Sequence, residues 1–141
     1  MGVGGTVELD GVAVTMVAAV HSSSIDNIED KKGGCYVGIA AGFVLTIADG
    51  PVLYHAGDTA VFGDMKLIQE LYQPEVVMLP IGGYFTMGPR EASLAVRLLK
   101  PKIVLPLHFG TFPPLKGTPQ QLAALIDAGI QVVPWSPGET I

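Results

Sequence analysis

The chain has 141 residues and a net charge of −5, and only 15% of its residues are charged while 49% are hydrophobic. Ordinary globular proteins are about 25% charged, and a small domain, with much surface for its volume, should need more polar residues rather than fewer. We therefore expect one domain with more apolar material than it hides alone, which indicates a partner surface or a missing piece.

Composition and charge disfavour several partners and locations. The apolar residues 12–20 fall far short of the roughly 18–20 residues of a membrane-spanning helix, so we expect no membrane partner. The acidic net charge and the scattered Lys and Arg residues argue against a nucleic-acid partner. The start MGVGG lacks signal-peptide features, and a single cysteine, Cys35, fits a reducing compartment, so we expect a cytoplasmic protein. We expect the Cys35 thiol to be buried or inert.

The first part of the chain is predicted to form β structure. Two apolar runs flank Asp10 and Gly11, a pair typical of a two-residue hairpin turn. Residues 21–34 are polar and irregular, which predicts a loop. Residues 35–48 predict a strand pair or one long bent strand, with Gly38 and Gly42 at points of close packing or a bulge. A second hairpin turn at residues 49–50 leads into a strand over 51–56.

Helices and strands alternate after residue 58. The first helix, over 63–74, has an apolar face formed by Met65, Ile68, Leu71 and Tyr72. Pro89 opens the second helix, at a position where its missing N–H costs nothing. The apolar positions of that helix are Ala92, Leu94, Ala95, Leu98 and Leu99. A capping box at Thr118 and Gln121 begins a third helix, which Gly129 ends. Short strands are expected over 75–81, 102–108 and 130–135, so the fold class is α/β.

Polar or glycine-rich residues follow four of the predicted strands. His21, Asp58 and His108 each come after a strand, and Gly82 and Gly83 come after another. Open α/β sheets bind ligands at such strand ends, and two histidines with a carboxylate suit Zn²⁺ and similar ions. The separations are too long for a zinc finger, so the fold would have to bring the three residues together.

Purely structural interpretations of the same residues stay open. A lone His after a strand is more often a hydrogen-bonded structural residue, and Asp58 could cap the helix that follows it. His55 points away from Tyr54 on an alternating strand, which favours packing or support of Asp58 over direct ligation. The serines at 22–24 lack a nucleophile elbow, and the glycines at 82 and 83 do not form a phosphate-binding fingerprint.

An ordered set of motifs resembles one family. The blocks AVHSSS, AGFVL, YHAGDT, FGDMKLI, LPIGGYFTMGPREA and VLPLHFGTFP are together similar to the uncharacterised metal-dependent hydrolases of the metallo-β-lactamase superfamily. The resemblance implies the C-terminal part of an αββα sandwich. It implies that His21 completes one metal site, that Asp58 bridges two metals and that His108 closes the second site. We expect His55, Thr59, Gly82 and Gly83 behind the ligands or beside the substrate.

The resemblance also implies that part of the site is absent from this chain. The superfamily's H-x-H-x-D-H motif supplies most metal ligands and a catalytic aspartate, and it has no counterpart among the three histidines present. We therefore expect a truncated, mis-started or split enzyme, with catalytic residues unknown and a homo-oligomer or a complementing N-terminal chain as partner. Up to two divalent ions are expected, zinc first and Mn, Fe or Ni as alternatives. The substrate would be a small ester, lactone or phosphodiester. The competing interpretation is a non-catalytic binding or assembly module.

Overall fold

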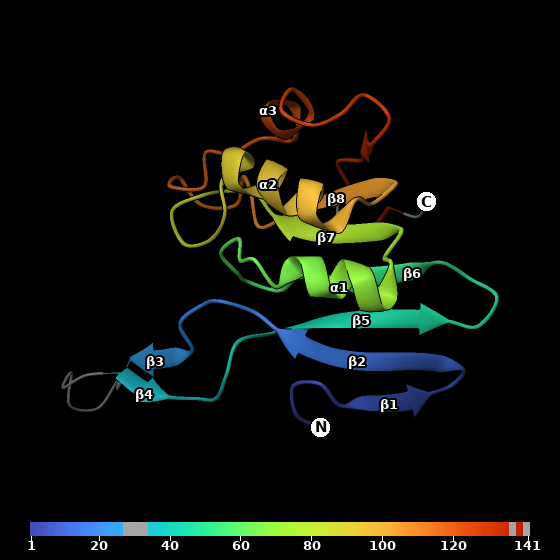
Figure 1. The fold of residues 1–141 in the computed structure, drawn as a ribbon. Helices are drawn as coiled ribbons and strands as arrows, with labels where there is room; N and C mark the ends of the chain where they lie inside the picture. The colour runs from blue at the N-terminus through green and yellow to red at the C-terminus, as the bar shows by residue number, and fades with distance from the viewer. Residues whose placement is uncertain (27–33, 136–137, 140–141) are drawn as a thin grey trace.

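A computed structural model describes residues 1–26, 34–135 and 138–139 of the chain (Figure 1). Twelve elements follow one another in this described part: β1 (Thr6–Leu9), β2 (Val12–Ala18), β3 (Ser24–Asp26), β4 (Gly34–Tyr36), β5 (Ala41–Ile47), β6 (Val52–His55), α1 (Met65–Tyr72), β7 (Val76–Pro80), α2 (Pro89–Leu99), β8 (Ile103–Leu107), α3 (Pro119–Ala123) and β9 (Gln131–Val132). The predicted α/β class is confirmed.

The described strands form one large mixed sheet and one small arm. The large sheet has the order β1-β2-β5-β6-β7-β8-β9, and the arm pairs β3 with β4. Strands β1, β2, β5 and β6 pair antiparallel, whereas β6 through β9 pair parallel, each joined to the next by a helix. The hairpin predicted at Asp10 joins β1 to β2, and Asp10 has the left-handed φ of 48° that such a turn requires.

One face of the large sheet carries the hydrophobic core. Figure 1 shows α1 and α2 lying in front of the sheet. The side chains of Val44, Tyr54, Val77 and Val104 occupy one row across β5 to β8 and are fully buried. They contact buried helix residues such as Met65 and Ala92 within one cluster. Burial of these apolar side chains is the main force that holds the helices on the sheet.

The opposite face of the sheet is also apolar but less covered. Alternation along the strands places two rows on it. The first row is Met16, Phe43, His55, Met78 and Leu105, and the second is Val14, Leu45, Leu53, Val76 and Ile103. All but Leu105 are only partly buried. His55 therefore points away from Tyr54, as the alternation predicts, and it is the one polar residue in the two rows.

Several expectations about local structure were wrong. Residues 21–34 are not simply a loop, because β3 lies within them and β4 begins at Gly34; residues 27–33 of this stretch lie outside the described residues. Residues 35–48 are neither one bent strand nor a pair, since β4 joins the arm and β5 joins the large sheet. The Cys35 thiol is exposed rather than buried, because β4 pairs only with β3.

The apolar stripes of the helices are narrower than predicted. In α1, Leu71 is 71% exposed while Met65 and Ile68 are buried. In α2, Leu94 is 41% exposed, and the buried face is Ala92, Ser93, Ala95, Val96 and Leu99. Only part of each apolar stripe is buried, so the residues at its edge stay in solvent.

The C-terminal region is less regular than its sequence pattern predicts. The capping box at Thr118 forms as expected, but α3 ends at Ala123, well before Gly129. Strand β9 is two residues long rather than six. Among the described residues, none of the helices has the length and apolar character needed to cross a membrane.

Candidate metal site at the strand ends

The C-terminal ends of four strands meet at one edge of the large sheet. Strands β6, β7 and β8 are parallel. Strand β2 runs antiparallel to β5, which runs antiparallel to β6, so β2 points the same way as β6. His21, Asp58, Gly82 and His108 follow β2, β6, β7 and β8 respectively. The strand topology therefore brings the predicted residues to one edge, as the sequence pattern indicated.

Asp58 and His108 face each other across this edge. His108 Nε2 lies 3.7 Å from Asp58 Oδ2, and the two side chains are 28% and 51% exposed. This separation is too long for an ordinary hydrogen bond. Two ligands about 2.0–2.2 Å from one tetrahedral zinc ion would lie about 3.4 Å apart. The pair therefore has the donor atoms and nearly the spacing needed to share a divalent ion.

Backbone geometry fixes both members of this pair. Gly57 has φ 66°, and a Cβ built there would lie 2.5 Å from the Ala41 carbonyl oxygen, so the turn that presents Asp58 requires glycine. His108 itself has φ 51°, an uncommon conformation for a non-glycine residue. Its carbonyl lies against Gly82, where any Cβ would overlap it. Such strained positions cluster at functional sites.

The second ring nitrogen of His108 is not held by a side chain. Nδ1 is buried and has no hydrogen-bond partner in the part of the chain that the structure describes. A metal-bound histidine usually donates this N–H to a carboxylate or carbonyl. The described residues thus supply no hydrogen bond at Nδ1 that fixes the orientation of the His108 ring.

His21 lies in the same hollow as Asp58 but is held by backbone carbonyls. The hollow has a volume of about 410 Å³ and is lined by His21, Ser22, Ser23, Ser24, Val37, Ala40, Ala41 and Asp58. His21 Nδ1 lies 2.6 Å from the Ser22 carbonyl oxygen, and Nε2 lies 3.2 Å from that of Phe85. The described residues contain no group of three or more His, Cys, Asp or Glu placed to hold one metal ion.

The residues expected behind the ligands form hydrogen bonds with backbone groups rather than with the Asp58 carboxylate. His55 Nδ1 accepts a hydrogen bond from the Gly57 N–H at 3.0 Å, so it supports the turn that carries Asp58. Thr59 is fully buried, and its hydroxyl bonds Val20 and Ala60 instead of Asp58. The Gly83 N–H donates to the Met87 carbonyl and closes the loop after β7.

Sequence reasoning missed the backbone groups of the site. The Phe85 carbonyl oxygen contacts the His21 ring, and the Ala41 carbonyl oxygen lies against Gly57. Both act through the position of the backbone, for which residue type carries no signal.

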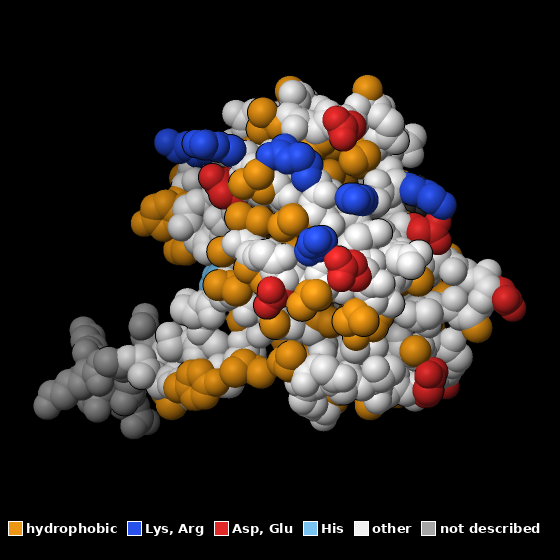
Figure 2. Space-filling model, in the orientation of Figure 1, with side chains coloured by type: hydrophobic (Ala, Val, Ile, Leu, Met, Phe, Trp, Pro, Cys, Tyr) orange, Lys and Arg blue, Asp and Glu red, His pale blue; other side chains and the backbone are white. Residues whose placement is uncertain are grey.

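Apolar side chains also gather beside the site. Figure 2 shows hydrophobic side chains along the β3–β4 arm, where the exposed ones are Ile25, Tyr36, Val37 and Ile39. Val37 reaches the hollow that holds His21.

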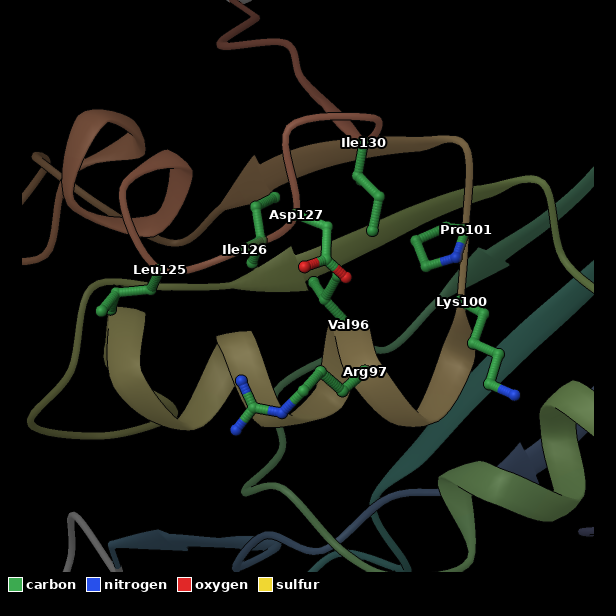
Figure 3. Close-up of a pocket in the computed structure, with 8 residues that line it drawn as sticks. All are labelled: Val96, Arg97, Lys100, Pro101, Leu125, Ile126, Asp127 and Ile130. Carbon is green, nitrogen blue, oxygen red and sulfur yellow. The ribbon is translucent and has the colours of Figure 1, made fainter.

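A second hollow, of about 440 Å³, lies at the other edge of the sheet. Its walls come from the end of α2 and from residues just before β8 and β9, which is the N-terminal side of the parallel strands. Figure 3 shows the Asp127 carboxylate turned toward Val96, while Arg97 extends along α2 and Lys100 projects from just beyond the end of that helix. This second hollow is lined by none of the residues predicted to bind metal.

Comparison with known proteins agrees with this geometry. A family profile described as "Beta-lactamase superfamily domain" matches residues 2–108. A UPF0173 metal-dependent hydrolase of Methanoculleus marisnigri is 48% identical over 143 residues, covering 100% of this chain and 62% of that protein. One from Myxococcus xanthus is 50% identical over 141 residues, covering 97% of this chain and 50% of that protein.

A solved structure gives the same result. Igni18, described as a novel metallo hydrolase from Ignicoccus hospitalis, superimposes with a TM-score of 0.82 at 37% identity, covering 100% of this chain and 58% of that one. The chain thus spans about half to three fifths of the length of the relatives it matches. Its fold, its strand-end residues and the profile match together place the chain in the metallo-β-lactamase superfamily, beside the UPF0173 metal-dependent hydrolases.

Proposed function

We propose that this chain carries part of the active site of a metal-dependent hydrolase. The observation that carries the proposal is the Asp58–His108 pair, with Nε2 and Oδ2 3.7 Å apart at the strand ends. Asp58 and His108 would hold a divalent ion, zinc first. His21 would contribute to a second ion once its Nε2 exchanges the Phe85 carbonyl for that ion. When bound, such an ion lowers the pKa of a water molecule toward about 7 and polarises the scissile group.

The site needs ligands from outside this chain. A catalytic zinc usually has three protein ligands and an open position, and the described residues supply no such group. Parallel strands, such as β6 to β8 here, are nearly always covered on both faces of a sheet, whereas all residues but Leu105 in the two apolar rows opposite the helices are only partly buried. We infer that a complementing N-terminal chain segment covers this face and brings the missing ligands. A second copy of the chain is the other occupant to be tested.

We propose a neutral ester or lactone as the first substrate class to test, ahead of a phosphodiester. Phosphate recognition generally uses Arg or Lys donors, and none lines the hollow among the residues that the structure describes. Its walls include the apolar side chains of Val37, Ala40 and Ala41 beside the serines at 22–24. Three small or aliphatic walls accommodate an uncharged group without the cost of leaving a charge unpaired.

A non-catalytic assembly module is the second candidate. The observation in its favour is the partly exposed apolar sheet face itself, since an apolar surface that is left open to solvent marks an interaction site. On this interpretation His21, Asp58 and His108 would no longer serve a metal site, and Asp58→Ala would leave partner binding unchanged.

Metal content of the purified chain tests the proposal. Plasma mass spectrometry after zinc loading, with the native mass recorded on the same sample, should show weakly bound zinc in the wild type, because this chain supplies only part of the ligands. Asp58→Asn and His108→Gln should lose that zinc. Asp64→Asn is the matched control, because Asp64 is exposed and makes no side-chain cap hydrogen bond at the start of α1. Equal zinc in wild type, Asp58→Asn and His108→Gln would contradict the proposed site.

A further inference from the structure

Thr59 links the two strand ends that carry His21 and Asp58. Its side chain is fully buried. The hydroxyl oxygen accepts a hydrogen bond from the Val20 N–H at 3.0 Å and donates to the Ala60 carbonyl at 2.7 Å. The Ala60 N–H in turn donates to the Val20 carbonyl at 2.8 Å. Both backbone groups of Val20, the residue before His21, are therefore bonded to the two residues after Asp58.

The same residue also contacts the loop after β7. The Met87 N–H donates to the Thr59 carbonyl at 3.3 Å, and two residues earlier the Phe85 carbonyl meets the ring of His21. Residues 58 and 21 follow strands that are not neighbours, because β5 lies between β2 and β6. Sheet pairing alone does not connect their ends, so this connection beyond the sheet depends on side-chain and loop hydrogen bonds.

We propose that Thr59 is a positioning residue that sets the distance between His21 and Asp58 by holding the backbone of Val20. This inference rests on the proposed function for its consequence, metal binding, but not for its structural content. Thr59 does not bond the Asp58 carboxylate, so its effect reaches the site through His21. Removing the hydroxyl leaves the Val20 N–H without its partner in a partly buried place, which is unfavourable.

Two substitutions separate the hydroxyl from the shape of the side chain. Thr59→Val keeps the volume and removes the hydroxyl, whereas Thr59→Ser keeps the hydroxyl and removes a methyl group. Thr15→Val is the matched control, since Thr15 is a buried threonine of β2 whose hydroxyl bonds Thr6 Oγ1 at 2.8 Å. If Thr59→Val does not fold, Thr59→Ala takes its place in every comparison.

The first readout is local and needs no metal. Amide exchange at Val20 should be about tenfold faster in Thr59→Val than in Thr15→Val, with the two variants compared under conditions that give them equal global stability. The ring resonances of His21 should shift while those of His55 do not. Thr59→Ser should restore both. Unchanged exchange at Val20 and unchanged His21 resonances in Thr59→Val would overturn the inference.

The second readout is zinc affinity by competition with a chromophoric chelator. Loss of a residue that orients a ligand typically weakens metal binding by about 10–100-fold, so Thr59→Val should fall in that range and Thr59→Ser should stay near wild type. Weakened binding without any change at Val20 or His21 would also overturn the inference. If the wild-type chain binds no zinc, the proposed function fails for this chain alone, and the exchange and resonance comparison still decides the role of Thr59.

Discussion

Gly57 offers the sharpest test of how the fold presents Asp58. Its φ of 66° disfavours any side chain, and a Cβ there would lie 2.5 Å from the Ala41 carbonyl oxygen. An L-residue in the left-handed region costs about 1–2 kcal/mol, and overpacking costs about 1–3 kcal/mol. Gly57→Ala should therefore lower the free energy of unfolding by about 2–5 kcal/mol, a large part of the about 5–15 kcal/mol that holds a domain together.

Three further glycines separate the two contributions. Gly110 has φ 72° and open space around it, so Gly110→Ala should show only the backbone cost. Gly42 has no left-handed φ, but its Cβ would lie 2.8 Å from the His55 carbonyl oxygen, so Gly42→Ala should show only the steric cost. Gly63 has neither constraint, and Gly63→Ala should be neutral or stabilising by about 0.4–1 kcal/mol.

Urea unfolding at equilibrium measures all four variants on one scale. Gly57→Ala should be close to the sum of the Gly110→Ala and Gly42→Ala effects. It should also reduce zinc binding, because the turn that aims Asp58 has to move, while Gly110→Ala should not change zinc binding to the same extent. If Gly57→Ala destabilises no more than Gly110→Ala, the Ala41 carbonyl yields easily and the turn is not the rigid support described above.

Three other predictions concern the core, the arm and the last helix. The Tyr54 hydroxyl is fully buried without a partner among the described residues, so Tyr54→Phe should raise the free energy of unfolding by up to about 1–3 kcal/mol in urea titrations. Burial raises the pKa of Tyr54 in the folded chain above that in the unfolded chain. The free energy of unfolding is therefore independent of this group below pH about 10 and falls as pH rises further, because the unfolded chain loses the Tyr54 proton first. Tyr54→Phe removes this loss and should unfold at higher pH than wild type in alkaline titrations. The exposed Cys35 should react with a thiol reagent without denaturant, and a reaction that waits for unfolding would contradict the placement of β4. Thr118→Ala, which removes a cap bond to the Gln121 N–H, should cost about 1 kcal/mol by thermal unfolding, whereas no change would mean that α3 is not held by its cap.

The order of strands and helices was predictable because local signals coincide with burial. The turn at Asp10, Pro89 at the start of α2 and the capping box at Thr118 all form as the sequence indicates. Helix faces were less predictable, since Leu71 and Leu94 are apolar yet exposed. Periodicity marks which residues can share a face, but the width of the contact depends on the curvature and length of the partner surface.

The candidate site was predictable to the level of strand ends. Polar residues after parallel strands must meet at one edge, and Asp58 and His108 do so. The partners of Thr59 and His21 were not predictable, because they are backbone groups of Val20 and Phe85 far along the chain. The arm was missed because β3 and β4 pair only with each other and have no alternating apolar pattern strong enough to mark them.

The open sheet face and the incomplete ligand set are linked by position. The row that contains Phe43, His55 and Met78 lies on the face opposite the helices, and three residues beyond His55 the chain reaches Asp58. A layer seated on this face would therefore border the edge where Asp58 and His108 meet. If a second copy of the chain supplies that layer and its missing ligands, zinc content per chain should rise with protein concentration as dimers form. If the copy only covers apolar surface, dimers should form without added zinc, and only a chain carrying new histidines would raise the metal content.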